Sequence, residues 1–137
     1  MSFEIDFFPV GEGDKSGDAI AFRYGNLTGP RAEQTVVVVD GGTKAAGEAI
    51  VSHLRNYYAT DFADSILSTH PDLDHSSGLA AVMESLDFGQ LVMHRPWEHA
   101  SEICDLFKTP HSPSRMSEKL EKAISAAHET RIYCHQA

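Results

Sequence analysis

The sequence predicts an α/β fold in which a mixed β-sheet has helices on its outer face. Strand-like and helix-like segments alternate between residues 36 and 93, as in βαβ units. Two strand candidates joined by a glycine-rich turn precede them. Of the 137 residues, 42% are hydrophobic, which is enough to build the core of one domain.

The first two strands are expected to form a hairpin. Residues 3–8 (FEIDFF) alternate between polar and apolar until the aromatic pair, and Pro9 ends the pattern. A turn-rich stretch at residues 11–18 leads into a second strand candidate at residues 19–24. The spacing of these glycines matches neither a Walker A loop nor a dinucleotide fingerprint, so we interpret them as a hairpin turn.

Residues 36–39 are four consecutive valines, which favours a strand that is buried on both faces. This strand ends at a turn formed by residues 40–42 (DGG). A helix is expected over residues 45–58, because its apolar residues recur at helical spacing, namely Ala46, Ile50, Leu54 and Tyr57. That spacing predicts a helix that packs one face on the sheet.

A strand, a helix and another strand follow. Residues 65–69 are expected to form a short strand, and residues 90–93 another. Between them, four apolar residues mark an amphipathic helix, namely Leu79, Val82, Met83 and Leu86. Further along, we expect a short helix at residues 103–107, a helix over residues 114–127 and the start of a strand at residue 132.

Charge and composition limit the classes of function. The chain has 11 basic and 20 acidic residues, a net charge of -9, which argues against binding nucleic acid through an electropositive groove alone. A phosphate-bearing substrate would need a bound cation. We expect a cytoplasmic protein without a membrane segment, because no apolar run approaches about 20 residues and the start does not resemble a signal peptide. Two cysteines are too few for a disulfide framework.

The segment most informative about function is residues 69–78 (THPDLDHSSG), between an expected strand and an expected helix. It contains four potential metal ligands within six residues, His70, Asp72, Asp74 and His75. In an extended chain His70 and Asp72 point to the same side and can reach one cation, and a turn can aim the other pair at a second cation. The sites of α/β proteins lie at such carboxyl ends of strands.

The acidic residues around this segment suggest a cation as well. Residues 61–87 contain six carboxylates and no Lys or Arg. Carboxylates that are brought close together repel one another and some stay protonated unless a cation neutralises them.

The motif at residues 70–75 (HPDLDH) resembles the signature of the metallo-β-lactamase superfamily, with Asp72 in place of the second histidine. This variant is similar to the hydrolase domain of the DNA-uptake competence proteins, the ComEC-like subgroup. Two upstream segments also match in order: residues 8–14 (FPVGEGD) with residues 17–20 (GDAI), and residues 39–42 (VDGG). The resemblance covers roughly residues 3 to 93.

The resemblance implies roles for individual residues. His70 and Asp72 would bind one metal ion, and Asp74 and His75 the other, while Asp74 also orients the attacking water. Asp40 would hold the ligand loop through hydrogen bonds. Zinc is the expected ion, with manganese as the alternative, because a carboxylate in place of an imidazole makes the ligand set harder.

The resemblance also implies the fold, an αββα sandwich of which residues 1–137 hold the N-terminal half as a single domain, truncated at its C-terminal end. The superfamily completes its two-metal site with a later Asp and His, which would be expected beyond residue 137. After the strand at residues 90–93, the loop that carries His94, Arg95 and Trp97 would face the site, and His94 is a candidate for contacting substrate.

We therefore expect a hydrolase that uses a metal-activated water, with phosphodiester bonds, in nucleic acid or elsewhere, as the favoured substrate. Hydrolysis of an ester, a thioester or an amide on the same fold is the first alternative. The second is a truncated, non-catalytic module that acts through protein contacts. In that second case a partner chain or a second copy would cover the missing half.

Overall fold

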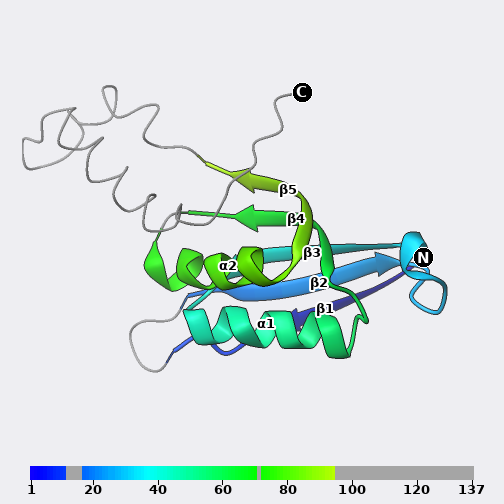
Figure 1. The fold of residues 1–137 in the computed structure, drawn as a ribbon, viewed down its shortest axis with the longest axis horizontal. Helices are drawn as coiled ribbons and strands as arrows, with labels where there is room; N and C mark the ends of the chain where they lie inside the picture. The colour runs from blue at the N-terminus through cyan, green and yellow to red at the C-terminus, as the bar shows by residue number, and fades with distance from the viewer. Residues whose placement is uncertain (12–16, 71, 95–137) are drawn as a thin grey trace, which may run out of the picture. The chain divides into compact units, whose positions relative to one another are not determined.

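A computed structural model describes residues 1–11, 17–70 and 72–94 of the chain (Figure 1). Their elements are, in order, β1 (Ser2–Phe7), β2 (Ala19–Gly25), the short 3-10 helix η1 (Arg31–Glu33), β3 (Gln34–Gly41), α1 (Lys44–Asn56), β4 (Phe62–Ser68), α2 (Leu73–Ser85) and β5 (Asp87–Met93). Residues Met1–Met93 form one compact unit. The predicted elements at residues 103–107, at residues 114–127 and from residue 132 lie outside the described residues.

The five strands form one mixed sheet in the order β1-β2-β3-β4-β5. β1, β2 and β3 pair antiparallel, whereas β3, β4 and β5 pair parallel. Helix α1 connects β3 to β4 and α2 connects β4 to β5, as parallel neighbours require. The predicted α/β fold with a mixed sheet and an N-terminal hairpin is therefore confirmed.

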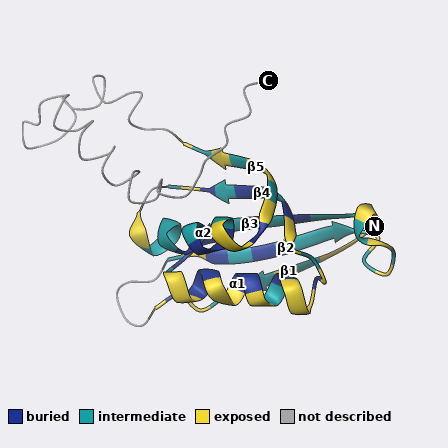
Figure 2. Cartoon of the chain, viewed as in Figure 1, coloured by how far each residue is buried: buried dark blue, intermediate teal, exposed yellow. Residues whose placement is uncertain are grey.

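Both helices lie on the same face of the sheet, where they bury the core (Figure 1). Dark blue buried residues alternate with yellow exposed ones along α1 (Figure 2). The largest buried apolar side chains come from both helices and from β3 and β4, namely Ile50, Leu54, Val82, Val36, Val38 and Ile66. Neither helix in the described part of the chain combines the length and apolar character needed to cross a membrane.

Two predictions about burial were only partly right. In β3, Val36 and Val38 are fully buried under the helices, but Val37 and Val39 on the other face are only half-buried. At the end of α1, Tyr57 is 70% exposed and Tyr58 is 3% exposed. The helix ends at Asn56, so the chain leaves the helical spacing and Tyr58, rather than Tyr57, turns into the core.

β1 reverses the usual polarity of an edge strand. Phe3 and Phe7 are 75% and 76% exposed, whereas Asp6 points toward α1. The Asp6 carboxylate accepts a hydrogen bond from the Tyr58 hydroxyl at 2.5 Å and lies 3.0 Å from Nε2 of His53. Side chains alternate across a strand, so the face of β1 that points away from the helices is apolar.

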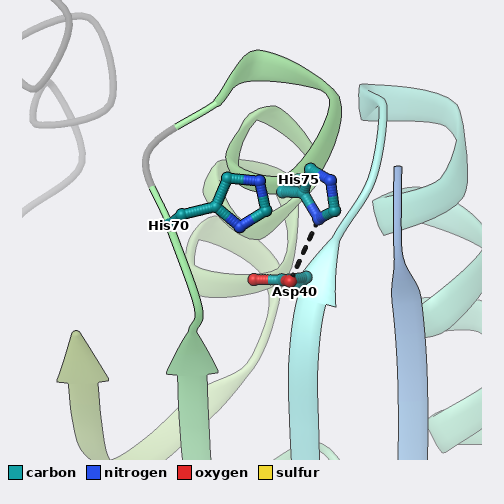
Figure 3. Close-up of side chains that lie close together, drawn as sticks. All are labelled: Asp40, His70 and His75. Carbon is teal, nitrogen blue, oxygen red and sulfur yellow. Dashed lines mark hydrogen bonds and ion pairs between the residues drawn. The ribbon is translucent and has the colours of Figure 1, made fainter. Parts of the chain in front are cut away.

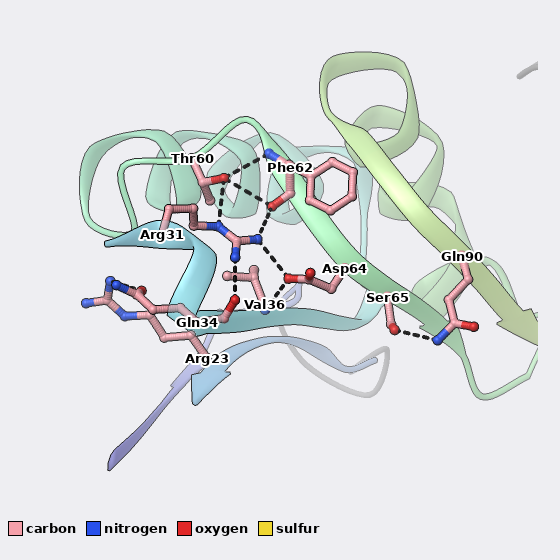
Figure 4. A network of polar contacts seen from close by, with 9 residues as sticks. All are labelled: Arg23, Arg31, Gln34, Val36, Thr60, Phe62, Asp64, Ser65 and Gln90. Atoms are coloured by element: carbon pink, nitrogen blue, oxygen red, sulfur yellow. Dashed lines mark hydrogen bonds and ion pairs between the residues drawn. The ribbon is translucent and has the colours of Figure 1, made fainter. Parts of the chain in front are cut away.

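A guanidinium fixes the start of β3 against β4 (Figure 4). Arg31 donates to the carbonyl oxygen of Gln34 at 2.5 Å, to the Thr60 hydroxyl at 3.2 Å and to the Asp64 carboxylate at 2.8 Å. Asp64 also accepts from the amide of Val36 at 2.7 Å. This network holds the two parallel strands together at their first residues, and their carboxyl ends then lie side by side at the other end.

Candidate functional site

The candidate site lies at the carboxyl ends of β3 and β4 (Figure 3). Asp40 is the next-to-last residue of β3, His70 follows β4 by two residues, and His75 lies in the first turn of α2. Parallel neighbours end at the same edge of a sheet, where α/β proteins place their ligand sites. As predicted, the motif follows a strand, but its residues from Leu73 onward already belong to α2.

Asp40, His70 and His75 bring together three potential ligand atoms that all lie within 4.8 Å of one another. The ring centroids of the two histidines are 3.9 Å apart. The side chains of Asp40 and His75 are 1% and 12% exposed, and that of His70 is 42% exposed. The group therefore extends from the buried end of β3 to the surface.

Both carboxylate oxygens of Asp40 already face hydrogen-bond donors. Oδ1 accepts from the Thr69 amide at 2.9 Å, and Oδ2 accepts from the Thr69 hydroxyl at 2.5 Å. Oδ2 also lies 3.2 Å from Nδ1 of His75. These three contacts use most of the lone pairs of the carboxylate, so they favour a role for Asp40 in positioning the histidine.

The contact with Asp40 determines which ring nitrogen of His75 can bind a metal. A carboxylate only accepts hydrogen bonds, so this contact requires a proton on Nδ1. The amide of Asp18 also points at Nδ1, from 3.3 Å, and would need a lone pair there. We assign the proton to Nδ1, because the Asp40 contact is the shorter one and is charge-assisted. Nε2 of His75 is then left with a lone pair for a metal.

Direct backbone contacts set the position of α2 over β3. The amide of Gly42 donates to the carbonyl oxygen of His75 at 3.1 Å, and the amide of Gly78 donates to the carbonyl oxygen of Gly42 at 2.8 Å. A Cβ atom at Gly78 would lie 1.9 Å from the carbonyl oxygen of Gly41, so only glycine allows this approach. Asp40 has a positive φ of 53°, a conformation that aspartate tolerates better than most residues.

Asp72 lies beside His70, as the extended spacing predicted. Its Oδ2 is 3.8 Å from Nε2 of His70. Two atoms that each lie about 2.1 Å from one ion can be at most about 4.2 Å apart, so this distance fits a shared cation. Asp72 is the N-cap residue of α2, but within the described residues its side chain makes no capping hydrogen bond. The carboxylate therefore remains available as a ligand for a metal ion.

Asp74 occupies the first turn of α2, next to His75. The helix begins at Leu73, so both residues are helical, whereas the sequence suggested a turn. The described carboxylates of Asp72 and Asp74 lie outside the group formed by Asp40, His70 and His75. The backbone of Asp74 touches the hairpin, since a Cβ atom at Gly17 would lie 1.7 Å from its carbonyl oxygen. The role of Asp74 at a second cation stays a prediction.

The acidic segment at residues 61–87 does not act as one cluster. Asp61 pairs with Arg55 at 2.5 Å and Asp64 with Arg31 at 2.8 Å. Asp61 directly precedes β4 and Asp64 is its third residue, so both lie near the opposite end of the strand from His70. The inference that all six carboxylates call for a cation was therefore wrong, because arginines from outside the segment neutralise two of them.

Two residues near the histidines were not among the predicted site residues. Thr69 contacts both Asp40 and His70, and Asp18 places its amide against His75 and its carboxylate 3.7 Å from Nδ1. Both belong to the motif segments, but nothing in their spacing indicates these contacts. His94 directly follows β5 and is exposed, and its contact with substrate stays a prediction.

Comparisons of the chain with models of protein families, with curated proteins and with solved structures find no match.

Proposed function

We propose that this protein is a metal-dependent hydrolase of the metallo-β-lactamase type, with its site at the carboxyl ends of β3 and β4. The observation that carries the proposal is the 3.8 Å separation of His70 Nε2 and Asp72 Oδ2, a distance that suits two ligands of one ion. His75, with the lone pair on Nε2, and Asp74 would hold a second ion. Further ligands would come from outside the described residues.

The donor set fits a divalent cation chemically. Two neutral imidazoles and two carboxylates suit zinc, and the carboxylates also suit manganese. A net charge of -9 is compatible with a cation as well, since the ion reverses the sign of the local field. Zinc is the first ion to test and manganese the second.

A divalent cation held here would act as a Lewis acid and lower the pKa of its water. The protein's own residues would bind and orient the reactants. Asp74 would accept a hydrogen bond from the attacking water. The Asp40 carboxylate lies 3.2 Å from Nδ1 of His75 and would restrict rotation of the His75 ring.

A phosphodiester is the substrate class we favour, because a cation site can neutralise a phosphate on a chain whose own charge would repel it. Esters, thioesters and amides are the alternative, since the fold does not fix the substrate.

The sandwich fold is part of the same proposal. The face of the sheet away from the helices carries exposed Phe3, Ile5 and Phe7 on β1 and half-buried Val37 and Val39 on β3. A second sheet packed on this face would bury these side chains, as in β-sandwich cores. An uncovered apolar face of this kind supports the alternative of a module that binds a partner as well.

The proposal is tested by metal binding and by hydrolysis. Calorimetric titration with zinc or manganese should show binding that Asp72→Asn weakens, and the matched variant Asp87→Asn, at the exposed start of β5, should bind like the wild type. A chromogenic phosphodiester should be cleaved faster than a chromogenic ester, and Asp74→Ala should abolish the cleavage. Equal metal affinity in the Asp72 and Asp87 variants would refute the site.

A further inference from the structure

The hydroxyl of Thr69 occupies the space between a buried carboxylate and an exposed imidazole. Oγ1 lies 2.5 Å from Oδ2 of Asp40 and 2.8 Å from Nδ1 of His70. A threonine hydroxyl has one proton to donate and can accept further hydrogen bonds. The direction of each of these two contacts therefore follows from the chemistry of the partners.

Asp40 determines the first direction. Its carboxylate can only accept, so the Thr69 hydroxyl donates its single proton to Oδ2. The hydroxyl oxygen then has only lone pairs to offer to His70. Nδ1 of His70 must therefore be the donor and must carry a proton.

We propose that Thr69 is a positioning residue that relays the charge of Asp40 to His70, so that one carboxylate fixes the tautomers of both histidines. Asp40 acts on His75 directly, over 3.2 Å, and on His70 through the Thr69 hydroxyl. Both rings then carry their proton on Nδ1 and keep the lone pair on Nε2. This inference rests on the proposed function only in assigning Nε2 to a cation.

The position of Asp72 bears on this assignment only through the proposed cation. Its carboxylate oxygen Oδ2 lies 3.8 Å from Nε2 of His70, which is the ring nitrogen that the relay leaves unprotonated. Without a cation, the Asp72 carboxylate would favour a proton on Nε2 of His70, because a carboxylate only accepts hydrogen bonds. A shared cation needs the lone pair on the Asp72 side.

Backbone geometry keeps Thr69 in place for this role. The amide of Thr69 donates to Oδ1 of Asp40 at 2.9 Å, so both polar groups of the residue bind the same carboxylate. Replacing the hydroxyl by a methyl group leaves this amide contact intact. Thr69→Val should therefore keep the loop attached to β3 while it removes the relay.

The decisive experiment is NMR of the metal-free 137-residue chain labelled with 15N, at a pH where both histidines are neutral. Couplings between ring protons and ring nitrogens report which nitrogen is protonated. We expect Nδ1–H for His70 and His75 in the wild type and in Thr69→Ser. In Thr69→Val, we expect His70 to lose this preference and His75 to keep it.

Three results would overturn the relay: a wild-type His70 protonated on Nε2, an unchanged His70 in Thr69→Val, or an equal change in both histidines. Thr28→Val, which removes an exposed hydroxyl bonded to Asn26, serves as the matched control and should leave both rings unchanged.

Titration with zinc alone separates this inference from the proposed function. Thr69→Val should bind zinc about 10-fold more weakly than the wild type, and Thr69→Ser should restore most of the affinity. If the tautomers behave as expected but the wild type binds neither zinc nor manganese, the relay stands and the hydrolase proposal fails. If zinc binds but Thr69→Val does not weaken it, Thr69 has no positioning role toward the ion.

Discussion

Oδ2 of Asp40 lies 3.2 Å from Nδ1 of His75, although the two residues are 35 positions apart in the chain. Asp40 is the next-to-last residue of β3 and His75 lies in the first turn of α2, and backbone hydrogen bonds at Gly42 and Gly78 join the two elements. The carboxylate also accepts two hydrogen bonds from Thr69. This one buried side chain therefore organises the candidate site.

Asp40→Asn should destabilise the protein. Asparagine tolerates the positive φ of 53° at this position, so the backbone conformation can persist. Its amide group would, however, face donors where the carboxylate accepted hydrogen bonds, at a cost of about 2 kcal/mol in the free energy of unfolding. Urea denaturation would measure this loss. The exposed control Asp87→Asn should change stability by less than about 0.5 kcal/mol, and equal values for both variants would contradict the role of Asp40.

Tyr58 should make stability depend on alkaline pH. Burial and the hydrogen bond to Asp6 raise the pKa of the Tyr58 phenol above its ordinary value of 10.0. The folded state therefore holds the proton more tightly than the unfolded state does. The resulting stabilisation is fully present below about pH 10 and is lost above it, at up to about 1.4 kcal/mol per pH unit.

Urea denaturation between pH 8 and pH 11 would measure this dependence. Tyr58→Phe should remove the contribution of the Tyr58 phenol to the pH dependence. The stability of this variant should therefore fall less steeply above pH 10 than that of the wild type. Tyr57→Phe is the matched control, because Tyr57 is 70% exposed, and it should keep the wild-type slope. Identical slopes for Tyr58→Phe and the wild type would show that the Tyr58 phenol titrates normally.

Arg31 and Asp64 should be energetically coupled. The guanidinium spans η1 and β4 at 2.8 Å from the carboxylate, with both side chains about one-third exposed. A double-mutant cycle with Arg31→Met and Asp64→Asn should give a coupling of about 1 kcal/mol. The same cycle for Lys44 and Glu48, whose exposed side chains are 3.9 Å apart, should give almost none. Similar couplings for the two pairs would contradict a structural role for the Arg31 network.

Gly78→Ala should disrupt the packing of α2 on β3. The added methyl group would lie 1.9 Å from the backbone oxygen of Gly41, which cannot move without breaking the strand. We expect a loss of about 3 kcal/mol or more in the free energy of unfolding. The control Ser52→Ala, on the exposed side of α1, should change stability by less than about 0.5 kcal/mol. Wild-type stability in Gly78→Ala would mean that the helix does not approach the strand this closely.

Phe3 and Phe7 should give the protein an accessible apolar surface. Phe3→Ser/Phe7→Ser should bind less of a hydrophobic fluorescent dye than the wild type. Its stability should change little, because these side chains are already about three-quarters exposed. Unchanged dye binding would show that this face is covered.

Local patterns were sufficient to predict most of the fold. The helical spacing of Ile50 and Leu54 predicted α1, and the spacing of Leu79 and Val82 predicted α2, because burial on one side imposes the period of the element. Element ends were less accurate. β5 begins at Asp87, three residues before the predicted start, since pairing with β4 extends the strand beyond its apolar residues.

The sequence by itself determined the α/β class, the order of the elements and the position of a ligand-rich segment directly after a strand. Periodicity and residue type are local properties, so they can be interpreted from the sequence without knowledge of the fold. Only the tertiary structure decided that Thr69 joins Asp40 to His70, and that arginines neutralise Asp61 and Asp64 far from the site. These contacts join residues from different elements, and their partners are set by sheet register and helix packing, which local spacing does not encode.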